Sequence, residues 1–265
     1  MRCRIPGSLY RRFIPLPTIA VAAVLVMMLS VTLMPSALAH YLWIEQDAKG
    51  NARLYFGEFE NALNEKSPGR LDEIRAPLSF KQRHGGLGAS SSAATAPLAS
   101  ARTADGFMLA GRADAKHSLI ATDASMAVKD WRASGVGIVK PVFYARYAAS
   151  AAAFPAQMAL DVTPDGSDGR FKVTLNGKPL AKSKVEIYAP NGWARDARTD
   201  DAGVVTFAMP WRGQYVLEAT HKEETPGEYE GAKYEALRHR ATLTIMQSRG
   251  APTFTPATAK MKQMH

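Results

Sequence analysis

Residues 183–221, SKVEIYAPNGWARDARTDDAGVVTFAMPWRGQYVLEATH, decide the fold of this chain. Apolar and polar residues alternate along its segments, and Gly, Pro, Asn and Asp stand between them. Alternation with period two is typical of strands that bury one face, and these punctuating residues are typical of turns. The stretch therefore predicts short antiparallel strands of a β-sandwich.

The same pattern extends in both directions. MALDVTP (158–164) and GRFKVTLNGKPL (169–180) precede the stretch, and RHRATLTIM (238–246) is expected to be its last strand. The order of these segments, with TDDAG joining two strands and G-x-Y beginning the next, resembles the prealbumin-like or carboxypeptidase-regulatory type of β-sandwich. We expect residues 158–246 to form an immunoglobulin- or prealbumin-like domain.

The preceding residues, 40–157, predict a second β-rich domain. HYLWIEQ and ARLYFGEF, separated by DAKGN, indicate a hairpin over residues 40–59. Residues 85–101 are small, polar and without periodicity, which favours a flexible surface loop, and residues 247–265 are expected to be a flexible tail. The fold class is therefore all-β, with two β-sandwich-like domains. Further strands are expected at LSFKQRH, FMLAGR, HSLIATD and PVFYARYA.

Residues 1–39 have the three parts of a secretory signal peptide. Four arginines lie before the apolar run 19–33, and Ala37 and Ala39 form an A-x-A cleavage site. Cleavage there would release a periplasmic chain that begins at His40 and does not span the membrane. An uncleaved signal anchor is the alternative, and the Arg11–Arg12 pair leaves twin-arginine export open beside the general secretory route.

Composition narrows the chemistry of the mature chain. Its single cysteine, Cys3, leaves with the signal peptide, so disulfides and thiolate chemistry are excluded. Removing the four arginines of that segment from the net charge of +9 leaves +5 and no long basic run, which does not favour nucleic-acid binding. Any metal site must use His, Met, carboxylates or the new amino terminus.

Two histidines lie where a metal site could form. Side-chain alternation places His221 on the apolar face of its strand, with Tyr215, Leu217 and Ala219, and does the same for His239. If the two strands pair as a hairpin centred near Glu230, the histidines lie opposite each other, within reach of one ion. The alternative is a pair of core-edge histidines whose rings bond to backbone carbonyls.

His40 is the expected third ligand. Its free amino group and its ring could bind one metal together, as in the histidine brace of copper proteins. The aromatic run after it, YLW, predicts a buried strand that fixes His40 in space. Alternatively, His40 is only the residue that follows the cleavage site.

Other candidates are weaker. His84 and His117 are expected to be surface histidines, and the tail holds Met261, Met264 and His265, which would suit Cu(I) but more commonly belong to disordered segments. No G-x-S-x-G elbow, P-loop or G-x-G-x-x-G motif is present, so we expect no enzyme. The tryptophans are expected in the core: Trp43, Trp131, Trp193 and Trp211.

Several segments resemble a family of bacterial periplasmic proteins named only as a domain of unknown function. They are AHYLWIE, YFGEFENALNEKSPGRLDEI, GVGIVKPVFYARY, APNGWARDARTDDAGVVTFAMPWRGQYVLEATHKEETPGE and YEALRHRATLTI. Members are often described as periplasmic components of nickel or cobalt uptake systems (NikK-like). The resemblance implies His40 and His221 as ligands, whereas His239 is expected from strand geometry. A second histidine beside His40, present in some nickel-uptake proteins, is missing here.

These observations predict a periplasmic protein that binds a divalent transition metal through His40, His221 and His239. Nickel or cobalt is favoured by resemblance and copper by ligand chemistry, and the partner would be a component of a membrane transporter. Affinity should fall from pH 7 to 5, where imidazoles become protonated. Two alternatives are a histidine-brace copper mono-oxygenase acting on polysaccharides and a protein-interaction sandwich with no metal role.

Overall fold

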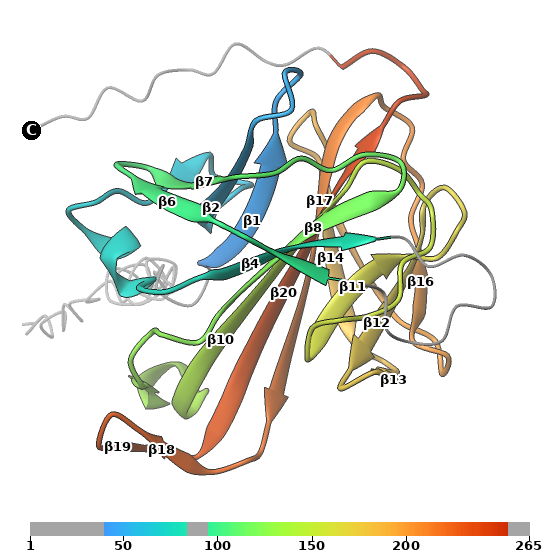
Figure 1. Ribbon diagram of the computed structural model, residues 1–265. Helices are drawn as coiled ribbons and strands as arrows, with labels where there is room; N and C mark the ends of the chain where they lie inside the picture. Colours follow the sequence, from blue (N-terminus) through green and yellow to red (C-terminus); the bar gives the residue numbers. More distant parts are fainter. Residues whose placement is uncertain (1–39, 84–94, 254–265) are drawn as a thin grey trace, which may run out of the picture. The chain divides into compact units, whose positions relative to one another are not determined.

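The computed structural model describes residues 40–83 and 95–253, which form an all-β fold (Figure 1). The expected signal peptide, His84 and the Met261, Met264 and His265 tail candidates lie outside these residues. The strands are β1 (Tyr41–Gln46), β2 (Ala52–Glu58), β3 (Leu63–Asn64), β4 (Leu78–Arg83), β5 (Thr95–Leu98), β6 (Ser100–Thr103), β7 (Gly106–Leu109), β8 (His117–Asp123), β9 (Lys129–Trp131), β10 (Gly137–Ala148), β11 (Leu160–Pro164), β12 (Arg170–Leu175), β13 (Lys178–Pro179), β14 (Lys184–Tyr188), β15 (Ala194–Arg198), β16 (Val204–Thr206), β17 (Gly213–Glu223), β18 (Gly227–Tyr229), β19 (Ala232–Tyr234) and β20 (Ala236–Gln247). Two short 3₁₀ helices are η2 (Arg70–Glu73) and η3 (Arg132–Ser134).

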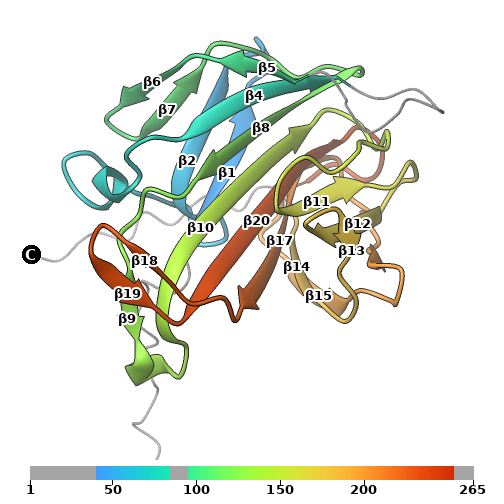
Figure 2. The same ribbon diagram turned by 60° about the horizontal axis from the view of Figure 1, so that its bottom comes forward.

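A nine-stranded sheet forms the centre of this fold. Its order is β15-β14-β17-β20-β10-β8-β4-β5, with β9 added beside β10 (Figure 2). The smaller sheets are β1-β2-β7-β6 with β3 beside β2, β11-β12-β13 with β16 beside β12, and the pair β18-β19. Within the described residues, no helix is long and apolar enough to cross a membrane.

The two larger of the three hydrophobic clusters among the described residues lie on opposite faces of the central sheet, and β10 contributes to both. Phe143, Ala145 and Tyr147 pack in the core that includes β1, β2 and β7. Tyr144 and Ala148, which alternate with them, pack in the core that includes β11, β12 and β16. The fold thus consists of two sandwich-like layers: a smaller sheet packs on each face of the shared central sheet.

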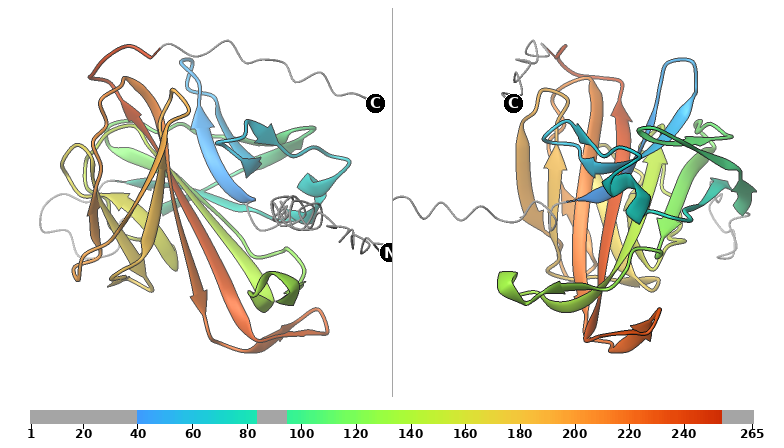
Figure 3. Two further views of the ribbon diagram at one scale, coloured as in Figure 1. Left: turned by 180° about the vertical axis from the view of Figure 1, so that it is seen from behind. Right: turned by 90° about the vertical axis from the view of Figure 1, so that its left-hand side faces the viewer.

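The long strands carry this shared sheet across the expected domain boundary at residues 157/158. β10 pairs in parallel with β20 from Val139↔Ala236 to Ala148↔Ile245, and β17 pairs antiparallel with β20 along its length (Figures 2 and 3). The central sheet is therefore continuous through the boundary, and the core that includes β11, β12 and β16 also contains Ile120 and Phe154 from before it.

The turns of the quoted stretch have the geometry that its residues predict. Asp200 accepts hydrogen bonds from the backbone N–H groups of Ala202 and Val204 at 2.9 and 2.8 Å, and Gly203 has φ +73°. This turn joins β15 to β16, and β17 begins at Gly213, as the TDDAG and G-x-Y pattern predicts.

Two expectations of irregular structure were wrong in part. Strand β5 and the start of β6 occupy residues 95–101, which were expected to belong to a flexible loop. The chain after β20 is also fixed as far as Ala251, whose N–H donates to the carbonyl of Pro210 at 2.9 Å. The edge strands β5 and β6 could not be recognised from the sequence. Their small polar side chains are mostly exposed, so they show no alternation of apolar and polar residues.

Candidate metal site

His40 is buried immediately before β1, with 3% of its surface exposed. Its ring Nδ1 lies 3.1 Å from Glu58 Oε1, and its Nε2 contacts the carboxylate of Glu65. The ring also packs against Phe56, with 5.4 Å between the ring centroids. Two carboxylates and an aromatic ring therefore hold the imidazole in place.

The pairing of β2 with two neighbours brings both carboxylates to His40. β1 pairs with β2 so that Tyr41 lies opposite Gly57, and the next step of this register places His40 opposite Glu58. On the other side of β2, the N–H of Glu65 donates to the carbonyl of Phe56 at 2.8 Å. Strand β2 thus supplies one carboxylate itself and aligns the other.

Gly57 makes this arrangement possible. Its φ is +148°, and a Cβ at this position would lie 2.0 Å from the carbonyl oxygen of Leu63 in β3. Only glycine permits so close an approach of two backbones. The segment that carries Glu58 and Glu65 can therefore fold back on itself beside His40.

The backbone at the start of β1 is anchored to the central sheet. Arg240 Nη1 donates to the carbonyl of His40 at 3.2 Å, and Thr242 Oγ1 donates to that of Leu42 at 2.7 Å. Arg240 is itself paired with the buried Glu218. These bonds fix the position of His40 although it lies at the very end of its strand.

One oxygen of Glu58 has no hydrogen-bond donor among residues 40–83 and 95–253. Oε2 accepts a hydrogen bond from Asn61 Nδ2 at 2.6 Å, whereas Oε1 is buried and accepts none from the described residues. Buried polar atoms are paired in the large majority of cases, and an exception needs an explanation. A ligand or a further donor at this oxygen would supply one.

Tyr41, the next residue, also contacts a carboxylate. Its hydroxyl donates to Glu60, and burial, followed by the charge of Glu60, raises the pKa of Tyr41 above its ordinary value. Burial also raises the pKa of Glu60. The segment from Glu58 to Glu65 therefore places three acidic residues around the first two residues of the expected mature chain.

Sequence reasoning missed Glu58, Glu65 and the nearby Arg70. All three lie in YFGEFENALNEKSPGR, which contains the end of the predicted hairpin and the start of a polar segment expected to be a loop or a short helix. The signal for Glu58 was present. Counting outward from the DAKGN turn of the predicted hairpin places His40 opposite Glu58, one step beyond the observed pair Tyr41↔Gly57.

His221 and His239 lie opposite each other, as the predicted hairpin required. They form a registered pair of β17 and β20, with ring centroids 6.5 Å apart. His239 is buried, and its two ring nitrogens lie 2.9 Å from Tyr144 Oη and 2.9 Å from Glu223 Oε2. Burial lowers the pKa of His239, and the hydrogen bond and charge of Glu223 oppose that effect.

The structure does not bring His40 together with this pair. Arg240 and Thr242, which bond to the backbone of β1, project from the face of β20 opposite to His239 and Ala241. His40 therefore lies on one face of the central sheet, whereas His221 and His239 lie on the other. A single centre built from all three would have to pass through the sheet.

The remaining candidate among the described residues is His117. Its Nδ1 lies 2.8 Å from Asp114 Oδ1, and its side chain is 29% exposed, so the expected surface histidine is partly exposed. Trp43 is buried, while Trp131, Trp193 and Trp211 are only partly buried, so the expectation of core tryptophans is met in full by one of four.

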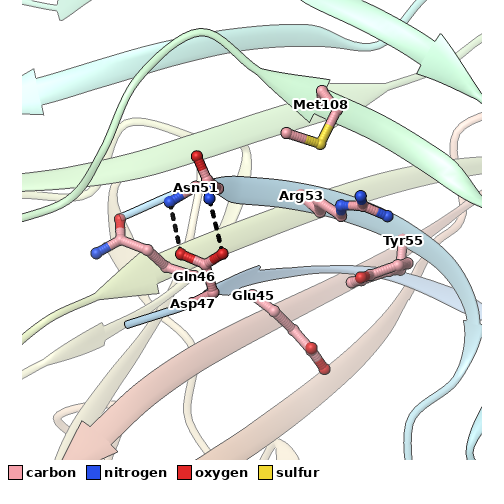
Figure 4. A pocket seen from close by; sticks show the side chains of 7 residues that line it. All are labelled: Glu45, Gln46, Asp47, Asn51, Arg53, Tyr55 and Met108. Atoms are coloured by element: carbon pink, nitrogen blue, oxygen red, sulfur yellow. Dashed lines mark hydrogen bonds between the residues drawn. The ribbon is translucent and has the colours of Figure 1, made fainter. Parts of the chain in front are cut away.

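A cavity of about 330 Å³ lies at the opposite end of the β1–β2 hairpin from His40 (Figure 4). It is lined mostly by polar side chains, together with Met108, and Asp47 accepts hydrogen bonds from the backbone and side-chain amides of Asn51. None of the predicted ligands lines it. This cavity therefore contributes nothing to the expected metal chemistry.

Side chains alone do not complete a metal site in the part of the chain that the structure describes. No three His, Cys, Asp or Glu side chains are grouped there so that they could hold an ion. The His40 cluster would gain a further nitrogen ligand only if the chain were cleaved before His40, because cleavage converts a backbone amide into an amine.

The fold and this cluster define an all-β protein of two sandwich layers on a shared sheet, with a buried histidine–carboxylate cluster at the start of its first strand. The chain belongs to the family described as Domain of unknown function (DUF4198), whose profile matches residues 37–223. No curated protein and no solved structure matches the chain.

Proposed function

We propose that this protein binds a divalent transition metal in the periplasm and delivers it to a component of a membrane transporter. The ligands are the amino group and ring Nδ1 of a mature His40 together with Glu58, and the metal is copper, nickel or cobalt. The observation that carries the proposal is the buried Glu58 oxygen that accepts no hydrogen bond among the described residues and lies 3.1 Å from His40 Nδ1.

This separation suits two ligands of one ion. Metal–ligand bonds from imidazole and carboxylate are about 2.0–2.2 Å long, and two such bonds at a right angle place their ligand atoms ~3 Å apart. The ring and the carboxylate therefore need little movement to share a metal. Their burial favours this use, because a carboxylate oxygen taken from water requires compensation by a cation or a donor.

The α-amino group completes a chelate. Its reference pKa is about 7.7–8, so a metal can displace its proton near neutral pH. Imidazole and amine nitrogens favour copper and nickel over harder ions, and a carboxylate is compatible with both. In this assignment His221 and His239 are not ligands of the same ion, because they lie on the other face of the sheet.

The resemblance to nickel- and cobalt-uptake proteins supports a transport role rather than catalysis. A polysaccharide-oxidising mono-oxygenase would need an exposed aromatic face beside the metal. The aromatic residues that follow His40, Tyr41 and Trp43, are 0% and 1% exposed, which gives that alternative no support.

Titration calorimetry with Cu(II), Ni(II) and Co(II) tests the proposal. The variants are the mature chain beginning at His40, the same chain with Ala39 retained, and Glu58→Gln. Retaining Ala39 and replacing Glu58 should each weaken binding by at least about tenfold, since each removes a ligand rather than an outer contact. His221→Ala is the matched control and should bind like the parent.

Two results would count against the proposal. The first is a parent chain that binds none of the three metals, which would leave the buried Glu58 oxygen to hold the α-ammonium group of His40 instead. Equal affinity with and without Ala39 would show that the amine is not a ligand.

A further inference from the structure

Arg70 places a positive charge directly at the His40 cluster. Its Nη1 lies 3.1 Å from His40 Nε2 and 3.4 Å from Nδ1, and 3.8 Å from the Glu65 carboxylate. A guanidinium is a donor at every nitrogen and remains charged. Arg70 therefore supplies a cation to a site where two carboxylates face one imidazole.

Resting on the proposed function, we propose that Arg70 is a built-in competitor of the metal: it occupies the His40 cluster in the metal-free protein and must swing out when the metal binds. The exchange regulates how tightly the site binds the metal. Because the metal has to displace the guanidinium of Arg70, the affinity for the metal is lower than the ligands alone would give, and release to a transporter becomes easier.

The position of Arg70 suits such an exchange. Its side chain is 32% exposed, whereas those of His40 and Glu58 are 2% and 6% exposed, so Arg70 lies between the buried ligands and solvent. A second partner is already in reach, because Arg70 Nε lies 3.3 Å from Glu73 Oε1. Rotation of the side chain towards Glu73 would vacate the cluster and keep the guanidinium paired.

The backbone that carries Arg70 is held firmly, so only the side chain needs to move. Leu71 in η2 is fully buried. Asp72 accepts hydrogen bonds from the N–H of Gly69 at 2.9 Å and from Ser67 Oγ at 2.7 Å. Arg102 Nη1 donates to the carbonyl of Leu71 at 3.2 Å.

The exchange predicts two effects of Arg70→Gln that point in opposite directions. Metal affinity should rise roughly fivefold or more, because the metal no longer has to displace a cation 3.8 Å from the Glu65 carboxylate, and an attraction between unit charges at that distance gives about that factor even at the dielectric constant of water. The metal-free protein should become less stable, because Glu65 loses a cation that lies 3.8 Å away. A residue with a purely structural role would lower both quantities or leave affinity unchanged.

The test compares mature parent, Arg70→Gln, Arg70→Lys and Arg75→Gln by calorimetric titration with Cu(II) or Ni(II) and by thermal unfolding without metal. Arg75 is the matched control, because it pairs with Glu230 and contacts neither His40 nor its carboxylates. Arg70→Lys keeps the charge and should bind metal much as the parent does.

Tighter binding together with a lower melting temperature in Arg70→Gln alone supports the exchange. Equal or weaker binding by Arg70→Gln, with a parent that binds metal, overturns the exchange and leaves the proposed function intact. No binding by either protein overturns both. Binding by Arg70→Gln but not by the parent supports the exchange in its strongest form.

Discussion

Replacing Asp161 by alanine should destabilise the protein strongly, because it would leave the charge of Arg146 buried without its counter-ion. Both side chains are 0% exposed, and Arg146 donates to Asp161 through Nε at 3.0 Å and Nη2 at 2.6 Å. Asp161 also accepts from the backbone N–H of Gln157 at 2.9 Å. The pair joins β10, the last strand before the expected domain boundary at residues 157/158, to β11, the first strand after it.

Removing one partner of a fully buried ion pair costs about 3–5 kcal/mol. Arg146 would keep Gln82 and Ser118 as acceptors, but both are neutral. For a chain of this size each kcal/mol lowers the melting temperature by about 2–4 °C, so Asp161→Ala should lower it by about 6–20 °C. The loss is a large fraction of the ~5–15 kcal/mol of a typical folded protein.

Urea unfolding and thermal unfolding of the metal-free mature protein measure this effect. The double variant Asp161→Ala with Arg146→Met should be more stable than Asp161→Ala alone, because it removes the uncompensated charge. Asp165→Ala is the control: its pair with Arg170 is largely exposed and should contribute little. If Asp161→Ala lowered stability by less than about 1 kcal/mol, the pair could not be buried as described.

Three further predictions concern residues around the two histidine clusters. Gly57→Ala forces a Cβ against the Leu63 carbonyl; it should cost about 1–3 kcal/mol in urea unfolding and weaken metal binding, and unchanged stability would contradict the described β2–β3 approach. Because burial lowers the pKa of His239, the unfolded state binds more protons below about pH 6.5, so stability should fall as the pH drops from 7.5 to 5. Urea unfolding should show a smaller loss over this range in His239→Gln, and an equal loss would mean that His239 is not the group responsible. Tyr144→Phe removes the hydroxyl beside His239 Nδ1 and should cost about 1 kcal/mol while metal binding is retained; weaker metal binding would link the two faces of the sheet.

The strands and the His221–His239 register could be predicted from the sequence because the information is local. Alternation placed Tyr215, Leu217 and Ala219 on a buried face, where the structure has them. The chain reverses near Glu230 and Gly231, which have positive φ, so β17 and β20 run antiparallel about a centre close to the predicted one. The buried face then fixes the register, because a slip of one residue would turn the apolar side chains to the other face.

The relation between His40 and that pair could not be predicted. It depends on the parallel pairing of β10 with β20 and on which face of β20 packs against β1. Such pairings join segments about a hundred or two hundred residues apart, and alternation alone does not say which neighbour covers which face. The sequence therefore indicated two sets of histidines but not that a sheet separates them.

Anomalous X-ray diffraction from crystals of the mature protein, grown with whichever of copper, nickel or cobalt binds most tightly, tests the central claim most directly. We expect one strong peak about 2.0–2.2 Å from the amino nitrogen and Nδ1 of His40 and from an oxygen of Glu58. A peak between His221 and His239 instead, or no peak at His40 in a protein that binds the metal in solution, would contradict the proposed site.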